Sequence, residues 1–348
     1  MPNALSLATQ WKDLFVPIAM MIIQPDPVLY ATALSSTVFY RHPRGVLSGA
    51  GADRLDLLHR LSTNGLIDLR QGQERTTILT TEKGRIIEVV RVVVMDDAIL
   101  MVLSSTEEDR VRLWLDKYTI MDDFVCTDVT PAWRVIGVYG EWSREGLQTI
   151  LDCNPPDNGS YVRFSSGVSE GILMRDVRLH GGAGFLLVVP VDDEEAVIQR
   201  LAGAGLHEID RSCYDVLRLE AGIPSMESEL DDRYNPLEAG MSQHISWTKG
   251  CYIGQEVIAR LDTYDKVQRH LVGVAFNHPP STNDDPVVCG VGADNGSEII
   301  GSVTSLAFSP GMRRVIGLAY IKTAHAVPGL EVVVGEGRGV IVKLPFER

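Results

Sequence analysis

The alternation of hydrophobic runs with short polar turns predicts a chain of many short strands and a few helices. In the first third, Lys83-Gly84 and Asp96-Asp97 separate three apolar, β-branched runs. These runs predict strands over residues 75–81, 86–95 and 98–103. Tight turns between consecutive strands are typical of an antiparallel meander. Apolar residues at helical spacing predict one helix before the meander, over 52–61, and one after it that Ser104 or Ser105 caps.

A similar order of elements follows in the second third. Residues 134–139 predict a strand, 142–151 a helix, 172–179 and 184–189 a hairpin, and 192–204 a second helix. Strand, helix, two strands and helix form a split βαβ arrangement. The likeness to the first third predicts two related lobes, although the sequence contains no clear repeat. A further helix is expected over 211–221, ended by Gly222-Ile223-Pro224.

Beyond Asp265, short β runs alternate with Gly, Pro and Asn. Six strands are predicted, over residues 271–276, 287–291, 299–308, 315–320, 331–334 and 340–344. Several short strands at close spacing are typical of a small antiparallel barrel. We therefore expect an α+β protein, with two mixed α/β lobes built on antiparallel sheets in residues 28–264 and a C-terminal barrel in residues 265–348.

Residues 1–27 are expected to form an N-terminal extension. Within them, residues 14–23 are a short apolar run interrupted by a proline. A secretory signal is one interpretation, but the run follows a single basic residue and precedes Pro-Asp-Pro, a poor cleavage region. We favour a disordered or loosely attached extension, with Met20 or Met21 as alternative starts and organised structure from about Val28.

Composition narrows the class of protein. Of 348 residues, 45% are hydrophobic and 22% charged, which is typical of a soluble globular chain. Lys and Arg total 32 against 46 Asp and Glu, and the net charge of −14 argues against a nucleic-acid-binding surface. No apolar run reaches the roughly 20 residues that span a bilayer. Five cysteines stand far apart without a C-x-x-C pair, which indicates no metal site and a reducing, cytoplasmic compartment.

One contiguous segment is far more specific. It reads Lys249-Gly250-Cys251-Tyr252-Ile253-Gly254-Gln255-Glu256 and continues into Val257-Ile258-Ala259-Arg260. Further matching segments, in order, are Gly51-Ala52-Asp53-Arg54, Leu61-Ser62-Thr63-Asn64, residues 217–224 and residues 235–240. Over residues 30–345 the chain resembles the YgfZ-type folate-binding proteins of iron–sulfur cluster maturation. These are relatives of the glycine cleavage T-protein, an aminomethyltransferase.

The resemblance implies a three-lobed fold around a central opening, where the pterin ring of tetrahydrofolate or a derivative binds. It also implies a protein that assists assembly or repair of iron–sulfur clusters in client enzymes, with only an indirect link to tRNA modification. The implied partners are the iron–sulfur assembly machinery, the client cluster enzymes and the folate. No direct contact with nucleic acid or membrane is expected.

Cys251 is the candidate functional thiol. It lies between two glycines, two residues from Lys249 and just before a helix expected near Gly254. A nearby ammonium and a helix N-terminus both favour thiolate, so we place Cys251 and Lys249 at the reactive site. The alternative is a small buried cysteine in a tight turn and a solvated lysine. A single cysteine cannot ligate a cluster alone, so any iron–sulfur cluster would be shared with a partner. Gln255 and Glu256 are expected either to bind at this site or to cap the local helix.

The candidate cofactor-binding residues differ from those of the T-protein. The resemblance places an Asp-Asp pair of the T-protein at Glu88-Val89, a pterin-holding glutamate at Leu186 and a pterin-holding arginine at Tyr214. Tyr214 would stack on the pterin, unless it is a core aromatic of its helix. Arg44, at the position of a second aromatic of YgfZ-type proteins, can also stack on a flat ring. For Glu88 we favour a side chain that points to solvent, because a carboxylate displaced by about an ångström can cost ~100-fold in rate.

Three functions are compatible with these residues. We favour a maturation factor that uses Cys251 and is not a conventional enzyme. The alternatives are a folate-dependent aminomethyltransferase or demethylase, and a non-catalytic folate-binding scaffold in which Cys251 is structural.

Overall fold

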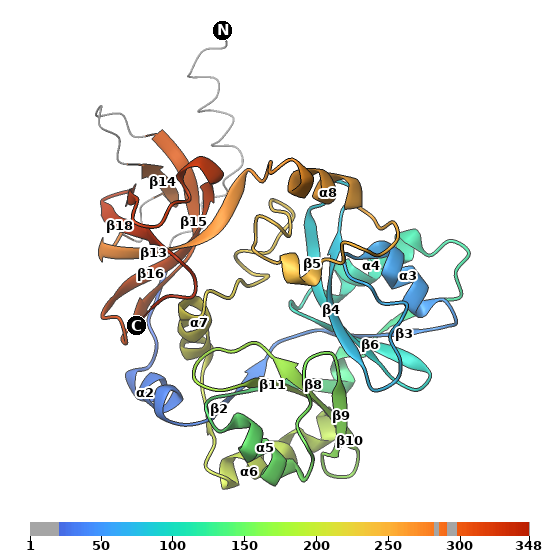
Figure 1. Cartoon of the computed structure of the whole chain (residues 1–348). Coiled ribbons are helices and arrows are strands. Elements are labelled where there is room, and N and C mark those ends of the chain that lie inside the picture. The colour runs from blue at the N-terminus through green and yellow to red at the C-terminus, as the bar shows by residue number, and fades with distance from the viewer. Residues whose placement is uncertain (1–20, 282–284, 291–297, 348) are drawn as a thin grey trace.

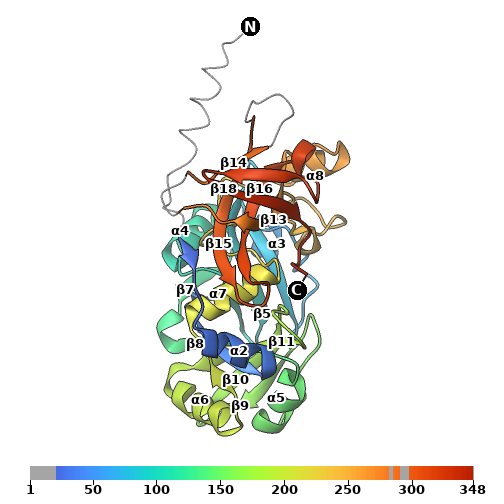
Figure 2. The ribbon, with the colours of Figure 1, turned by 90° about the vertical axis from the view of Figure 1, so that its left-hand side faces the viewer.

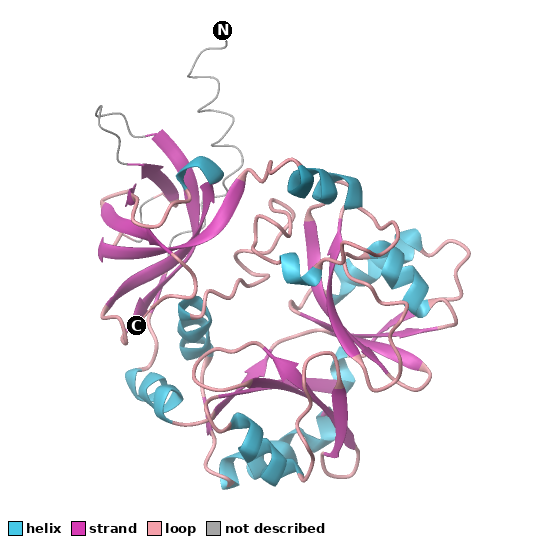
Figure 3. Ribbon diagram, in the orientation of Figure 1, coloured by secondary structure: helices cyan, strands magenta, loops and turns pink. Residues whose placement is uncertain are grey.

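Three β-sheets surround a common centre in the computed structural model of the chain (Figure 1). The structure describes residues 21–281, 285–290 and 298–347. Helices lie mainly on the outer sides of the first two lobes, whereas the third lobe is almost entirely strand (Figure 3). The predicted α+β fold with three lobes is confirmed.

The first lobe holds a five-stranded sheet in the order β4-β5-β6-β3-β7. Its strands are β3 (Val46–Ala50), β4 (Glu74–Thr80), β5 (Ile86–Val94), β6 (Ala98–Leu103) and β7 (Val125–Asp128). All pairings are antiparallel, as the predicted meander requires. Two helices, α3 (Arg54–Leu61) and α4 (Glu108–Tyr118), bury their apolar faces against this sheet. A 3-10 turn, η1 (Thr130–Ala132), leads into the second lobe.

The second lobe holds a six-stranded sheet in the order β12-β2-β8-β11-β10-β9. Its strands are β2 (Val38–His42), β8 (Trp133–Tyr139), β9 (Tyr161–Ser165), β10 (Glu170–Asp176), β11 (Gly184–Pro190) and β12 (His207–Glu208). Helices α5 (Ser143–Leu151) and α6 (Glu194–Gly203) cover its outer face, with the turn η2 (Val191–Asp193) before α6. The predicted hairpin is β10–β11. The sheet is mixed because β12 pairs in parallel with β2.

The third lobe is the predicted barrel. Its strands are β13 (Arg269–His278), β14 (Val287–Gly290), β15 (Glu298–Ser309), β16 (Arg314–Lys322), β17 (Glu331–Val334) and β18 (Gly337–Val342), with the turn η4 (Thr323–His325). Pairing of β15 with β16 closes the six antiparallel strands on themselves. Closure leaves no free edge among these six strands.

The N-terminal segment is attached more firmly than expected. Ile22–Ile23, inside the expected extension, form β1 and pair in parallel with β15 of the barrel. Helix α2 (Pro27–Ser35) follows, capped by Asp26, whose carboxylate accepts from the backbone N–H groups of Val28 and Leu29. The apolar run over 14–23 lies for its greater part outside the described residues, as do Met1 to Met20, so the two interpretations of that segment stay predictions.

Helix α7 (Arg211–Glu220) lies between the second lobe and the barrel (Figures 1 and 2). The Glu220 carboxylate, 3% exposed, accepts from the hydroxyl groups of Tyr30 in α2 and Ser309 in β15. After α7 the chain crosses the centre of the molecule as a long loop that includes η3 (Ser242–His244) and ends at α8 (Gln255–Thr263). The helix end predicted at Gly222 agrees with the structure, where that glycine has a φ of +70°.

A buried ion pair fixes the start of this long loop. Glu229 is fully buried, and its carboxylate accepts from the Arg218 guanidinium at 3.1 Å and from the backbone N–H of Ser225 at 2.9 Å. Its other oxygen accepts from Thr304 and Ser305 of the barrel at 2.7 and 2.5 Å. The carboxylate therefore ties the loop to both α7 and the barrel, which places the loop across the central cavity.

Candidate functional site

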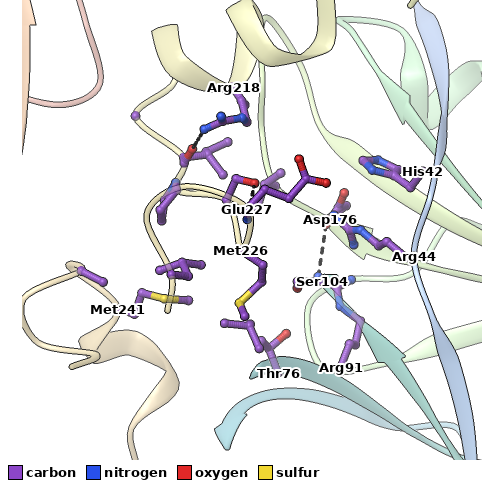
Figure 4. A pocket seen from close by; sticks show the side chains of 18 of the residues that line it. His42, Arg44, Thr76, Arg91, Ser104, Asp176, Arg218, Met226, Glu227 and Met241 are labelled. Atoms are coloured by element: carbon purple, nitrogen blue, oxygen red, sulfur yellow. Dashed lines mark hydrogen bonds and ion pairs between the residues drawn. The ribbon is translucent and has the colours of Figure 1, made fainter. Parts of the chain in front are cut away.

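The central cavity has a volume of about 440 Å³ and is lined by residues of all three lobes and of the long loop. Residues on its wall include Tyr40, Arg44, Val89, Arg91, Asp176 and Tyr214. Figure 4 shows His42, Arg44 and Asp176 together on one side of it, with Met241 on the other. Volumes of roughly 300–1,000 Å³ with a few convergent polar groups are typical of small-molecule sites.

Tyr214 projects from α7 into an aromatic group on the cavity wall. Its ring stacks on Tyr40 of β2, with centroids 4.5 Å apart and an angle of 11° between the planes. The His42 ring meets it edge-on at 4.8 Å. Burial and the nearby carboxylates raise the pKa of the Tyr214 hydroxyl, although Arg44 opposes them, so this hydroxyl is protonated at neutral pH. Tyr214 thus packs against the aromatic rings of β2 and also forms part of the cavity wall.

Arg44 lies in the turn between β2 and β3 and lines the same cavity. Burial lowers the pKa of its guanidinium, but the charge of Asp176 and the hydroxyl groups of Tyr214 and Tyr139 raise it above the usual value. The structure therefore brings Arg44 and Tyr214 together, as the cofactor-binding prediction requires. Their role in binding stays a prediction.

Asp176 at the end of β10 was not identified from the sequence. Its side chain is 3% exposed and lines the cavity. One carboxylate oxygen accepts from the Arg91 guanidinium of β5 at 3.2 Å, and the other accepts from the Tyr139 hydroxyl of β8 at 2.8 Å. Asp176 and its two partners come from three strands in two lobes, so only the tertiary fold assembles the group.

Glu88 is a correction to the sequence analysis. We expected its side chain to point to solvent, but it is fully buried. Its carboxyl group accepts from the backbone N–H groups of Val89 and Ser104, both at 3.0 Å, and contacts the Ser105 hydroxyl. Burial raises its pKa to about 7, although these hydrogen bonds oppose the shift. Because successive side chains of a strand point to opposite faces, Val89 lines the cavity and Glu88 does not.

Leu186, where the resemblance places the T-protein glutamate, also does not line the cavity. It is fully buried in the apolar core that joins the sheets of the two lobes, with Val46 and Val93 of the first lobe and Met174 of the second. The structure therefore places no polar group at this position.

The segment of residues 249–256, called the signature segment below, packs against the C-terminal end of α3. The Lys249 ammonium donates to the carbonyl oxygens of Ser62 at 2.7 Å and Asn64 at 2.8 Å, and also to that of His59. An ammonium has three N–H donors, and all three are used here. Burial lowers the pKa of Lys249 to about 7, whereas the three carbonyls favour the charged form. The Lys249 ammonium is therefore bound to backbone carbonyls, and its effect on the Cys251 thiol stays a prediction.

Cys251 is exposed at the surface of the signature segment and is not among the residues that line the cavity. Helix α8 begins at Gln255, as predicted, and Gly254 before it has a φ of +83°. Gln255 is partly exposed and Glu256 is exposed, and neither lines the cavity or caps the helix. The structure thus divides the predicted site residues into a cavity pair, Arg44 and Tyr214, and a surface group around Cys251.

Two further features bear on the site. Within the described residues, no group of three His, Cys, Asp or Glu side chains is placed to hold a metal ion. No helix in that part of the chain has the length and apolar character needed to cross a membrane.

Comparison with known proteins identifies the family. A family model described as the GCVT N-terminal domain matches residues 42–249, and one described as the glycine cleavage T-protein C-terminal barrel domain matches residues 269–346. The chain belongs to the glycine cleavage T-protein family. The two matches include nearly all the residues that line the cavity, the first residue of the signature segment, and all six strands of the barrel.

Curated relatives in this family include aminomethyltransferases. That of Streptomyces coelicolor is 30% identical over 318 residues, which cover 87% of this chain and 84% of the relative. That of Symbiobacterium thermophilum is 26% identical over 349 residues, covering 92% and 91%. A chloroplastic protein of Arabidopsis thaliana, named as a transferase, is 29% identical over 311 residues, covering 87% and 69%.

The fold is shared with a solved T-protein. The glycine cleavage system aminomethyltransferase T from Bartonella henselae superposes with a TM-score of 0.79 at 17% identity, covering 92% of this chain and 89% of that chain. The family and the fold expected from the resemblance are thereby confirmed. The finer YgfZ-type assignment stays a prediction.

Proposed function

We propose that the chain binds tetrahydrofolate or a derivative in the central cavity and takes part in folate-dependent one-carbon transfer of the aminomethyltransferase kind. The observation that carries this proposal is the cavity, where an aromatic pair, a buried carboxylate and guanidinium groups line one space of about 440 Å³. Relatives named aminomethyltransferase, which align with most of the chain, support it. We place this function ahead of cluster maturation on that basis.

The lining residues fit a reduced folate in their chemistry. Tyr214 and Val89 offer apolar surface for a flat ring, while Asp176 and Arg44 offer an acceptor and donors for its polar edge. Bound tetrahydrofolate would supply the nitrogen that accepts the one-carbon unit. The chain itself would orient the ring and exclude water from the transfer.

The transfer would proceed without the strand carboxylate of the T-protein. Val89 stands at the cavity wall where the second residue of the Asp-Asp pair falls, and Glu88 faces the other side of the sheet. Two other cavity carboxylates already have cationic partners, Asp215 with Arg218 and Glu227 with Arg211. Asp176 is likewise paired, with Arg91, so any acid–base step falls to the substrate.

Folate binding is tested by titrating the purified chain with 5-formyltetrahydrofolate. We expect saturable binding that weakens at least about tenfold in Tyr214→Ala, because the variant removes an aromatic wall of the cavity. Tyr264→Ala is the matched control, since that tyrosine is 63% exposed. A wild-type chain that binds no reduced folate contradicts the proposal.

Transfer is tested by incubating the chain with tetrahydrofolate and an aminomethyl donor and measuring methylenetetrahydrofolate. Product that still forms in Cys251→Ala and in Glu88→Gln supports a transferase whose site is the cavity. If the wild type binds folate but forms no product, the proposed folate binding stands and the proposed transfer is excluded.

A second function is favoured by the exposure of Cys251. Cys251 is exposed on a segment that Lys249 holds against the end of α3, so a partner protein has access to the thiol. Maturation of iron–sulfur clusters in client enzymes would use the thiol in this position, with any cluster shared between the chain and its partner. A deletion strain complemented with Cys251→Ala would then lose activity of a cluster enzyme, while folate binding by the purified variant stays unchanged. Full activity in that strain argues against this second function and for a structural cysteine.

A further inference from the structure

Asp176 is an unusual group on the cavity wall because it is a buried carboxylate held in one orientation. Tyr139 and Arg91 donate to different oxygens of the carboxylate, at 2.8 and 3.2 Å. An ionised carboxylate has about four acceptor sites, and these two donors use two of them. Because the Asp176 side chain lines the cavity, its oxygens can accept further hydrogen bonds from a ligand there.

A further hydrogen bond, from His42, holds the Tyr139 hydroxyl that donates to this carboxylate. The Nε2 atom of His42 lies 2.8 Å from the Tyr139 hydroxyl. Since that hydroxyl donates its proton to Asp176, the Nε2–H group of His42 must donate to the hydroxyl oxygen. Burial and the charge of Arg44 lower the pKa of His42 well below its usual value, so the ring is neutral. The hydrogen bonds therefore run in one direction, from His42 to Tyr139 and from Tyr139 to Asp176.

Donors lie beside the acceptor. The Arg44 guanidinium is close enough to Asp176 for the carboxylate charge to raise its pKa, and both side chains line the cavity on the same side (Figure 4). A guanidinium carries five N–H groups, so Arg44 retains donors for a ligand. The wall thus presents an acceptor for two parallel N–H groups next to a donor for one oxygen.

We propose that Asp176 is the specificity-determining carboxylate of the cavity and that it reads a 2-amino-4-oxopyrimidine edge, with Arg44 donating to the 4-oxo oxygen. This inference rests on the proposed folate function and names the residue that selects the ring. Such an edge offers two adjacent donors, the 2-amino group and N3–H, followed by one acceptor. Two parallel N–H···O bonds to a carboxylate are the strong, geometrically selective kind.

The assignment also accounts for the two positions that have lost their polar groups. Leu186 is sealed in the core between the lobes and Val89 is apolar, so neither can accept from a ligand. Asp176 supplies the missing carboxylate from the neighbouring strand, because β10 pairs directly with β11, which carries Leu186.

The same edge occurs in pterins and in guanine, and the experiment separates the two sources. Calorimetric titrations would compare 5-formyltetrahydrofolate, its analogue in which hydrogen replaces the 2-amino group, and guanosine. We expect the wild type to prefer the 2-amino ligand over the analogue by at least about tenfold, because a charged hydrogen bond is lost. In Asp176→Asn this ratio falls to near one. Asp192→Asn, an exposed aspartate of the same lobe, keeps the wild-type ratio.

Each outcome decides between the two ideas. A wild type that binds both folates equally, or an Asp176→Asn chain that keeps the wild-type ratio, overturns the role of Asp176 while leaving folate binding intact. Guanosine binding that depends on Asp176, without folate binding, supports the edge reading and overturns the folate function. Because the comparison of ligands on the wild type needs no variant, failure of Asp176→Asn to fold does not remove the test. Tyr139→Phe keeps the carboxylate but removes its donor, and we expect it to reduce the ratio without abolishing it.

Discussion

The Nζ atom of Lys249 lies 2.7 Å from the carbonyl oxygen of Ser62, 187 residues earlier in the chain. Helix α3 ends at Leu61, and the last carbonyls of a helix lack partners within it. The signature segment supplies these partners, since Lys249 bonds the His59 carbonyl and the backbone N–H of Ile253 bonds that of Arg60 at 3.1 Å. Its sequence is therefore explained in part as the cap of a distant helix.

Lys249→Met should destabilise the fold, because it leaves three carbonyls at and just beyond the end of α3 without their charged donor. We expect a loss of about 2–3 kcal/mol in the free energy of unfolding, measured by urea denaturation. Lys266→Met, which removes an exposed lysine, is the control and should change stability little. If both variants unfold alike, Lys249 is a surface charge without a capping role.

Two glycines in contact hold the signature segment against the β4–β5 turn. A Cβ atom at Gly254, where φ is +83°, would lie 2.6 Å from the carbonyl oxygen of Thr81 and 2.9 Å from the Cα atom of Gly84. Gly254→Ala should therefore cost about 1–2 kcal/mol for the left-handed backbone and a further 1–3 kcal/mol for the clash. Gly240→Ala, with a φ of +71° and open space around it, isolates the first contribution. Equal losses in thermal or urea unfolding would contradict the close contact.

Glu88 should make stability depend on pH. Its pKa rises from an ordinary 4.5 to about 7 on folding, mainly because of burial, so the folded chain binds more protons between these values. The stabilisation from this group is complete below about pH 4.5 and is lost as the pH rises through about 7. Glu88→Gln keeps an acceptor for the two backbone N–H groups but does not titrate. Its free energy of unfolding, relative to the wild type, should rise by about 2–3 kcal/mol between pH 5 and pH 8.

A parallel pH series with Glu256→Gln, an exposed glutamate, serves as the control and should show no such trend. A constant difference between Glu88→Gln and the wild type across the range would mean that Glu88 is ionised throughout, despite its burial.

The local hydrophobic pattern of the sequence predicted those helices and strands whose own residues carry a clear periodicity. The strand predicted over 98–103 is β6 itself, and the barrel strands were each found within a few residues. Helix α2 was missed because its apolar residues surround the helix without a periodic face. Strand β9 was missed because it is a five-residue edge strand whose hydrophobic residues are interrupted by Arg163.

Side-chain direction was harder to predict than secondary structure. Strand β5 is buried on both faces, so the alternation that normally separates core from solvent is absent, and Glu88 was assigned to the wrong side. The polar cavity group was also beyond reach, because Asp176, Tyr139 and Arg91 come from three different strands. Arg44 and Tyr214 were found only because the family resemblance drew attention to their positions.

The buried carboxylate of Glu229 should matter more for stability than any exposed acid of the long loop. Glu229→Gln removes one of the two carboxylates that pair with Arg218, which is only 5% exposed, and weakens the bonds to Thr304 and Ser305. Breaking a buried ion pair from one side costs about 3–5 kcal/mol, and because Asp215 still pairs with Arg218 we expect a loss at the lower end of that range, which thermal unfolding would detect. Asp232→Asn, in an exposed part of the same loop, should have almost no effect. Similar unfolding temperatures for the two variants would show that the loop is held in place by other contacts.

Cys251 should be the first cysteine to react with a maleimide in the native chain, because its side chain is exposed while burial protects the others to different degrees. Burial raises the pKa of Cys126 and of Cys213 to about 12, and it also raises those of Cys153 and Cys289. Since the thiolate is the reacting form, these four should be modified slowly until the chain unfolds. Peptide mass spectrometry after short labelling would give the order, with Cys251→Ser as the control that removes the fast site. Fast modification of another cysteine would move the candidate contact surface for a cluster-bearing partner away from the signature segment.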